Sequence, residues 1–313
     1  MKIVITGASG FIGKLLLKKH LELGDEVHVL SRRESTAFEF YPNLFHHKCD
    51  LLDLKNLQEF FIDADVLYHC AAEIRDESKM HSVNVEGTKN LLKVASGNIK
   101  HWVQLSSVGV YGPISSGNVS ETHSYNPINT YEKTKLESDL LVIAAAENNS
   151  FTYTLIRPSN VFGYGMKNNS LFQLIKVVDK GFYFFIGAKG ASANYISVSN
   201  VVQALYLAAT NPRARNEIYS VSSWSTLEHF IEIIANELGK PIPKLRIPLI
   251  FINSISGLMS LFSINLLTAS RIKALTNKSI YLTDKIEDQL GYKEVESMET
   301  ALMVLVGFYK KRN

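Results

Sequence analysis

The chain has little cysteine and almost no net charge. Its 313 residues include 2 Cys, and 33 Lys and Arg stand against 30 Asp and Glu, which gives a formal charge of +3. Two cysteines are too few for a disulfide framework and fit a reducing compartment. So small a charge excess excludes an extended nucleic-acid surface, and a hydrophobic fraction of 46% excludes a disordered chain. The length suits one large domain or two smaller ones.

The N-terminal apolar run is too short for a targeting segment. Residues 1–7 read MKIVITG, with no long apolar stretch before a small-residue cleavage site. A short β-branched run closed by Thr-Gly is typical of a buried strand. We therefore expect a mature protein in the cytoplasm.

The rest of the chain alternates strand-like and helix-like segments. Further strands are predicted at residues 26–30, 44–49, 66–70, 102–106 and 153–156. Helices are predicted at residues 11–23 and 131–147. This alternation indicates an α/β fold of the Rossmann type, a doubly wound parallel sheet with helices on both faces.

A glycine-rich turn joins the first strand to the first helix. Residues 6–13 read TGASGFIG, with glycines at the spacing GxxGxxG. The first glycine permits a tight turn, the second lets the backbone approach a pyrophosphate, and the third allows close helix–strand packing. The helix N-terminus supplies free N–H groups for phosphates. The pattern predicts a dinucleotide site that includes Gly7, Ser9, Gly10, Phe11, Ile12 and Gly13, and the alternative is a purely structural turn.

The end of the second strand bears on the choice of cofactor. A carboxylate there would bond the adenosine ribose, but this chain has Ser31, Arg32 and Arg33. Two guanidinium groups can pair with a 2′-phosphate, and no carboxylate at that position repels one. We therefore expect NADP, with NAD as the alternative if Glu34 or another group binds the ribose.

A Tyr and a Lys four residues apart form the candidate catalytic pair. Tyr131 and Lys135 share one face of a predicted helix. A cation beside a phenol favours the phenolate, so we expect Lys135 to lower the pKa of Tyr131. Ser107 follows a strand, where side chains face the ligand crevice, and its hydroxyl can bond the reacting oxygen. The alternative is an exposed helix pair without a function.

The order and spacing of these motifs resemble the extended short-chain dehydrogenase/reductases, the NAD-dependent epimerase/dehydratase group that modifies nucleotide sugars. The matching stretches are residues 6–13, Asp50-Leu51, 65–72 (DVLYHCAA), 84–88 (NVEGT), Ser106-Ser107 before 110–112 (VYG), Tyr131 with Lys135, and 157–163 (RPSNVFG). The resemblance covers the N-terminal two-thirds closely and the remainder loosely.

The resemblance implies roles for particular residues. The cofactor would be contacted by Asp50, Leu51, Ala71, Ala72, Tyr131, Lys135 and Pro158. Ser107, Tyr131 and Lys135 would form the catalytic triad, and Asn160 would touch the substrate. The resemblance also implies a smaller C-terminal α/β substrate domain interleaved with the first. We predict a dinucleotide-binding domain at residues 1–163 with a return at about 195–221, and a substrate-binding domain at 164–194 and 222–313.

Two stretches bear on the substrate. Relatives that bind nucleotide sugars often carry an arginine before Asp-Tyr-Ile-His-Val, but residues 193–198 read ANYISV, without that arginine. Glu73 and Arg75 follow the Ala-Ala pair and are candidate substrate contacts. A similar stretch occurs in epimerases acting on polyprenyl-diphosphate-linked N-acetylhexosamine. The alternative for Glu73 and Arg75 is a solvated charged loop.

Residues 247–270 form a long segment without Asp, Glu, Lys, Arg or His. Polar side chains recur along it at helical spacing, which favours an amphipathic helix over a membrane span. We expect it to pack within the substrate domain. The alternatives are an interfacial helix in peripheral contact with the inner face of a membrane, and a spanning helix.

The sequence therefore predicts an enzyme acting at C4 of an activated sugar. The first choice is an NADP(H)-dependent nucleotide-4-keto-sugar reductase that uses Ser107, Tyr131 and Lys135. The alternatives are an NAD-dependent 4-epimerase, acting on a UDP-sugar or a polyprenyl-linked N-acetylhexosamine, and a non-catalytic NADP-binding sensor. We expect no nucleic-acid partner and no metal, since His46 and His47 lack a nearby ligand cluster, and leave a homodimer open.

Overall fold

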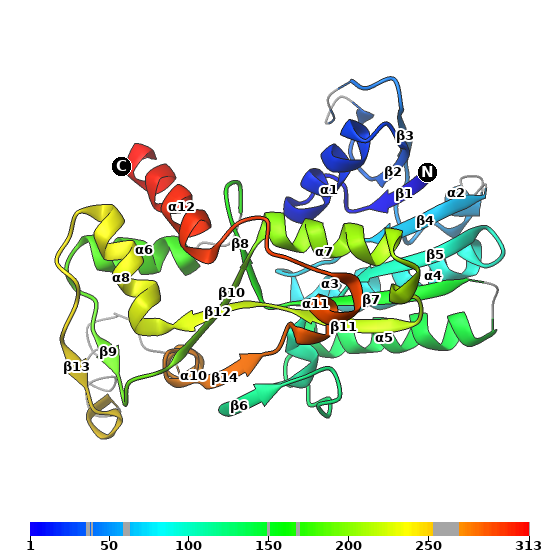
Figure 1. Ribbon diagram of the computed structural model, residues 1–313. Coiled ribbons are helices and arrows are strands. Elements are labelled where there is room, and N and C mark those ends of the chain that lie inside the picture. The colour runs from blue at the N-terminus through cyan, green and yellow to red at the C-terminus, as the bar shows by residue number, and fades with distance from the viewer. Residues whose placement is uncertain are drawn as a thin grey trace.

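A parallel sheet of seven strands organises the first part of the computed structural model (Figure 1). The structure describes residues 1–35, 38, 40–58, 63–148, 151–166, 170–252 and 269–312. The strand order is β11-β7-β5-β4-β1-β2-β3, and every neighbouring pair is parallel. The strands are β1 (Lys2–Thr6), β2 (Glu26–Ser31), β3 (Leu44–Lys48), β4 (Ala64–His69), β5 (Ile99–Leu105), β7 (Thr152–Pro158) and β11 (Glu217–Val221). The predicted Rossmann-type fold is confirmed.

Helices cover both faces of this sheet because successive strand residues point to opposite sides. Ile3 and Ile5 pack with residues of α1 (Phe11–Glu22), α7 (Val198–Thr210) and α11 (Asp284–Leu290). Val4 packs on the other face, with residues of α2 (Leu54–Gln58), α4 (Gly87–Ala95) and α5 (Thr130–Asn148). The sheet is therefore apolar on both faces, as a doubly wound sheet must be.

A second core lies at the other end of the molecule (Figure 1). Phe162, Ile175, Phe230 and Leu302 are among its buried side chains. Its helices are α6 (Ser170–Asp179), α8 (Leu227–Leu238) and α12 (Met298–Arg312). A sheet of three strands, β12-β10-β8, supports it, with bounds β8 (Asn160–Phe162), β10 (Ser192–Ser197) and β12 (Ser223–Thr226).

Short elements complete the two bodies. Two parallel pairs join β9 (Phe185–Ile186) to β13 (Arg246–Ile247) and β6 (Ser116–Val119) to β14 (Lys278–Tyr281). The remaining short helices are α3 (Glu77–Met80), the π-helical η2 (His81–Glu86), the 3₁₀ turns η3 (Val108–Tyr111) and η4 (Pro212–Ala214), and α10 (Ala269–Thr276).

The chain passes between the two cores several times. Within the predicted return at about 195–221, α7 covers the large sheet and β11 joins its edge, whereas β10 lies in the small sheet. Helix α11 also packs on the large sheet, although we placed residues 222–313 in the substrate domain. The domain division stays a prediction.

Most of the uncharged segment at 247–270 lies outside the described residues, which stop at 252 and resume at 269. The expected amphipathic helix is therefore not described. In the ranges that the structure describes, no helix is both long enough and apolar enough to cross a membrane.

Candidate active site

A cavity of about 1160 Å³ opens at the carboxyl ends of the central strands. In the sheet, β2 lies on one side of β1 and β4 lies on the other, so the order of the strands reverses at β1. The cavity lies at this topological switch point, where ligands bind in such sheets. The lining residues are Gly7, Gly10, Phe11, Ile12, Gly13, Cys70, Ala72, Ile74, Arg75, Glu77, Met80, Leu105, Ser106, Ser107, Asn129, Thr130, Tyr131, Lys135, Pro158, Ser159, Asn160, Val161 and Met166.

The glycine loop forms one wall and leaves no space for side chains. Gly7 has a φ of +73°, and a Cβ there would lie 2.6 Å from the amide nitrogen of Ala71. A Cβ on Gly13 would lie 2.2 Å from the carbonyl oxygen of Gly7. These contacts hold β1, α1 and the end of β4 together at backbone distance.

The N-terminus of α1 points its free amides at the same cavity. Gly10 is the residue before the helix, no side chain caps it, and the first turn contains no acidic residue. Uncapped amides and the positive end of the helix dipole suit a phosphate group. Together with the close glycine contacts, this arrangement fits the pyrophosphate of a dinucleotide.

Several predicted cofactor residues lie outside this lining. Ser31 is buried at the end of β2, where its Oγ accepts the amide of Arg33 at 3.1 Å, and Arg32 and Arg33 are exposed. The carboxylate of Asp50 accepts the amide of Leu52 at 3.0 Å. Other predicted residues that do not border the cavity are Ser9, Leu51 and Ala71. Their cofactor contacts stay predictions.

The candidate catalytic side chains share a second wall of the cavity. Ser107 caps η3, and its Oγ accepts the amide of Gly109 at 3.0 Å. Tyr131 and Lys135 lie one turn apart on α5, and the buried Lys135 Nζ donates to the carbonyl oxygen of Leu105 at 2.7 Å. The fold thus brings these three side chains to one cavity, as their spacing suggested.

The expected low pKa of Tyr131 is wrong for the protein alone. Burial raises the pKa of the phenol to about 12, nearby Asp139 adds to this, and a hydrogen bond with Ser107 lowers it. Burial also lowers the pKa of Lys135. The sequence argument counted the neighbouring cation but not the loss of water from both groups, which disfavours each charged form.

A buried ion pair lies next to these side chains, between α5 and the large sheet. Asp139 and Arg157 are fully buried and 3.0 Å apart. Asp139 also accepts the Ser106 hydroxyl at 2.6 Å, and Arg157 lies over the rings of Tyr111 and Tyr125. The pair therefore joins α5 to the ends of β5 and β7, one turn below Lys135.

The loop after β4 is held by its own carboxylate. Glu73 Oε1 accepts the amides of Ile74, Arg75 and Asp76 at 2.9, 2.8 and 3.2 Å, and these bonds lower the pKa of Glu73. Asn84 clamps the same loop, since its Oδ1 accepts the amide of Glu73 at 2.7 Å. Of the two predicted substrate contacts, Arg75 lines the cavity, whereas Glu73 does not.

The end of β7 and the start of β8 supply the remaining wall. Asn160 is exposed to the cavity, and its Nδ2 donates to the carbonyl oxygen of Asn194 at 3.1 Å. The neighbouring Ser159 lines the cavity, is 6% exposed, and its Oγ has no partner in the described part of the chain. Pro158 borders the same space.

Sequence reasoning missed several of these supporting residues. Asn84 stood in a quoted motif without a role, Asp139 follows Lys135 by one helical turn, and Ser159 precedes Asn160. The helical spacing could have placed Asp139 beneath Lys135. Nothing in the sequence indicated that Arg157 would pair with it.

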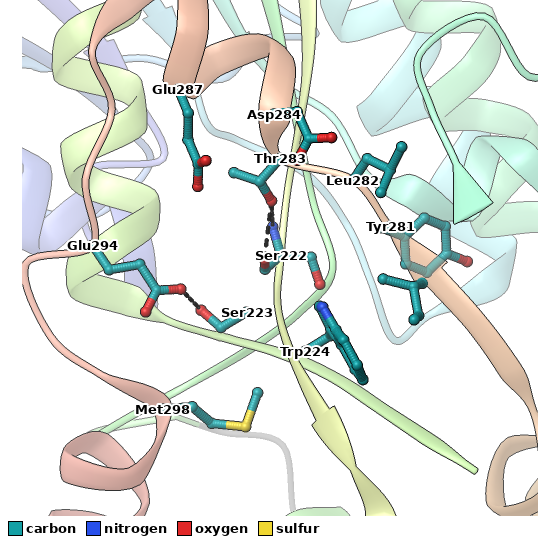
Figure 2. A pocket seen from close by; sticks show the side chains of 11 residues that line it. Ser222, Ser223, Trp224, Tyr281, Leu282, Thr283, Asp284, Glu287, Glu294 and Met298 are labelled. Carbon is teal, nitrogen blue, oxygen red and sulfur yellow. Dashed lines mark hydrogen bonds between the residues drawn. The ribbon is translucent and has the colours of Figure 1, made fainter. Parts of the chain in front are cut away.

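A second cavity, of about 310 Å³, shares no lining residue with the first (Figure 2). It lies where the start of β12 meets the end of β14 and the start of α11. Ser222 and Thr283 exchange hydrogen bonds there, and Ser223 donates to Glu294. Burial and the neighbouring carboxylates, Asp284 first, raise the pKa of Glu287. No predicted site residue borders it.

The large cavity defines a class of protein, a Rossmann-fold dinucleotide enzyme with a Ser/Tyr/Lys wall. The model of the NAD-dependent epimerase/dehydratase family matches residues 3–222. The chain therefore belongs to the NAD-dependent epimerase/dehydratase family, and the protein is an enzyme of the extended short-chain dehydrogenase/reductase type.

Three similar proteins illustrate the range of the family. The chain is 29% identical, over 79% of its length and 75% of the relative's, to N-acetyl-α-D-glucosaminyl-diphospho-ditrans,octacis-undecaprenol 4-epimerase of Escherichia coli O157:H7. It is 27% identical, over 79% of each chain, to UDP-glucose 4-epimerase of Vibrio cholerae. The structure of UDP-glucose 4-epimerase from Thermotoga maritima superposes with a TM-score of 0.77 at 21% identity, covering 100% of this chain and 99% of the other.

Proposed function

We propose that the protein is a nicotinamide-dependent sugar 4-epimerase, the alternative rather than the first choice of the sequence analysis. The observation that carries the proposal is the meeting of Ser107, Tyr131 and Lys135 on one wall of a cavity whose other wall is the glycine loop. The relatives named above support epimerase over reductase, because two are 4-epimerases of activated sugars. The cavity exceeds the usual range of about 300–1,000 Å³ for one ligand, so a sugar has room beside a cofactor.

Tyr131 and Ser107 have defined tasks in such a reaction. Tyr131 exchanges a proton with the sugar hydroxyl at C4, and Ser107 holds the same oxygen by a hydrogen bond. A bound nicotinamide supplies the hydride acceptor and donor. Tyr131 is protonated at neutral pH in the protein alone, so its action as a base requires an added positive charge nearby.

A second candidate is the NADP(H)-dependent 4-keto-sugar reductase. Arg32 and Arg33 favour it, because both are exposed at the end of β2, where a 2′-phosphate would lie. Position 31 is Ser, so no carboxylate there would repel the phosphate. A reductase exchanges its cofactor at each turnover, whereas an epimerase retains it. The state of the cofactor thus separates the two candidates.

The sugar carrier is the other open choice. Residue 193 is Ala, so the arginine that often pairs with a nucleoside diphosphate in the family is absent at this position. The relative that is 29% identical is named for an undecaprenyl-diphosphate-linked sugar, and on this likeness we favour a polyprenyl-diphosphate-linked N-acetylhexosamine over a UDP-sugar. This substrate would bring a cytoplasmic enzyme to the inner face of a membrane. A homodimer stays a prediction.

The test combines two measurements on the purified protein. Mass spectrometry identifies the nucleotide released by denaturation, and chromatography follows conversion of polyprenyl-diphospho-N-acetylglucosamine and of UDP-N-acetylglucosamine to their C4 epimers. Retained NAD with conversion of either sugar supports the epimerase. An empty site that takes up NADPH in preference to NADH, with no epimer formed, supports the reductase and contradicts the proposal.

A further inference from the structure

Two neighbouring segments of the second body expose large apolar side chains. Residues 180–190 and 239–251 run side by side through β9 and β13, where the amide of Phe185 bonds the carbonyl oxygen of Leu245 at 2.9 Å (Figure 1). The side chains that they expose by 51–77% are Phe182, Leu245, Leu249, Ile250 and Phe251. These five residues, with Lys180, Lys189 and Lys244 of the same segments, are called the apolar–basic face. Large apolar side chains exposed on two paired segments are typical of an interaction surface.

The core beneath this face does not use the exposed side chains. Residues 182–185 read FYFF, and the structure buries some of these side chains and exposes another. Tyr183 and Phe185 are buried in the second core, whereas Phe182 is 73% exposed. Phe182 lies before β9, in the stretch that leads into this strand, and its side chain is not part of the second core.

The same two segments carry charge of one sign. They contain Lys180, Lys189, Lys240, Lys244 and Arg246, and no Asp or Glu. Glu228 pairs with Arg246 and Asp179 with Lys240, which leaves the positive charges of Lys180, Lys189 and Lys244 in excess. An anionic surface is the electrostatic complement of such a face.

We propose that the apolar–basic face docks the enzyme on an anionic lipid bilayer. The apolar side chains would enter the boundary between headgroups and acyl chains, and the lysines would lie against the anionic headgroups. A second copy of this chain fits less well, because a symmetric contact would oppose like charges. A soluble phosphate compound would leave the apolar side chains unused. This inference goes beyond the proposed function, since docking requires no catalysis.

The experiment is co-sedimentation of the full chain with vesicles. Phosphatidylcholine vesicles that contain phosphatidylglycerol should bind the protein, and vesicles of phosphatidylcholine alone should bind it much less, with the difference lost at high salt. Replacing Lys180, Lys189 and Lys244 with Gln should weaken binding to anionic vesicles roughly 100-fold. The double change Ile250→Asp and Phe251→Asp should weaken it by a similar factor.

A matched control and a conservative variant complete the design. Met303 and Val304 are exposed apolar residues of α12, outside the face, and their change to Asp should leave vesicle binding unaltered. If the Asp variant of the face misfolds, Ile250→Trp with Phe251→Trp should still bind at least as tightly as the wild type. Failure of the wild type to bind, equal binding by all variants, or light scattering that shows the face joining two copies would each overturn the proposal.

Discussion

Two walls of the large cavity differ in how their polar side chains are held. We call the wall with Ser107, Tyr131 and Lys135 the sheet wall, and the wall with Ser159 and Asn160 the opposite wall. On the sheet wall, Ser106 donates to Asp139, Lys135 donates to Leu105, and Asn84 bonds both the Glu73 loop and Thr134. On the opposite wall, Ser159 Oγ is buried without a partner within the described ranges.

This difference separates two requirements of an enzyme. Proton transfer needs groups fixed within a few tenths of an ångström, and the bonded sheet wall supplies such groups. Substrate choice needs groups whose hydrogen bonds a ligand completes, and the opposite wall has such groups. We therefore expect changes on the sheet wall to affect kcat or folding, and changes on the opposite wall to affect KM.

The largest expected effect comes from removing the Tyr131 hydroxyl. Tyr131→Phe should lower kcat about 10²–10⁴-fold, because the proton transfer at C4 loses its acid and base. Cofactor binding and thermal unfolding should stay unchanged. Tyr164→Phe is the matched control, since Tyr164 is 66% exposed and does not line the cavity. Steady-state rates that Tyr131→Phe leaves unchanged would contradict a catalytic role of the sheet wall.

Breaking the buried ion pair should come next. Asp139→Asn leaves the Arg157 charge buried without its partner, which should cost about 3–5 kcal/mol in free energy of unfolding. Urea denaturation measures this cost. Glu86→Gln, which removes an exposed pair with Lys89, should cost under about 1 kcal/mol. Equal losses of unfolding free energy in the two variants would show that the buried pair of Asp139 and Arg157 stabilises the protein no more than an exposed pair does.

Acid should weaken the sheet side through its buried histidines. Burial lowers the pKa of His69 to about 3 and that of His101 to about 4, from an ordinary value of 6.5. Below pH 6.5 the unfolded chain binds protons that the folded chain does not, so folding stability falls as pH falls. The expected slope is about 1.4 kcal/mol per pH unit for each histidine.

Urea denaturation at a series of pH values checks this slope. His101→Gln keeps a hydrogen-bonding side chain without the titration, so its profile should be shallower than that of the wild type. His229→Gln alters an exposed histidine of α8 and serves as the control. A wild-type stability that does not change between pH 7 and roughly pH 4.5 would contradict the account.

The smallest effect is expected on the opposite wall. Asn160→Ala should raise KM for the sugar about tenfold with little change in kcat, because one hydrogen bond to the substrate is lost in both ground and transition states. Asn118→Ala, on exposed β6, is the control. A fall in kcat with constant KM would show that Asn160 acts in the chemical step and would contradict the contrast between the two walls.

Local motifs made the fold and the candidate catalytic group predictable. The glycine loop, the alternating segments and the spacing of Tyr131 from Lys135 are short-range patterns, and each corresponds to one turn, strand or helix face. The pairing of Asp139 with Arg157 depends on which strand lies beside α5, and no local spacing encodes that. Sequence predicted the parts of the site within one element better than the contacts between elements.

Charge alone did not indicate the surroundings of two side chains. Glu73 looked like a group for substrate, yet its carboxylate is engaged by three amides of its own loop. The phenol of Tyr131 was expected to be acidified, yet burial raises its pKa. Both outcomes depend on solvent exposure and backbone direction, which composition and spacing do not contain.

The central claim is reversible oxidation at C4 on the sheet wall. Its most direct test is conversion of N-acetylglucosamine substrate, on either carrier, that carries deuterium at C4. We predict that the C4 epimer forms with the deuterium retained and with no net change in cofactor redox state. Loss of the deuterium into a stoichiometric, released reduced cofactor, without the epimer, would contradict the claim.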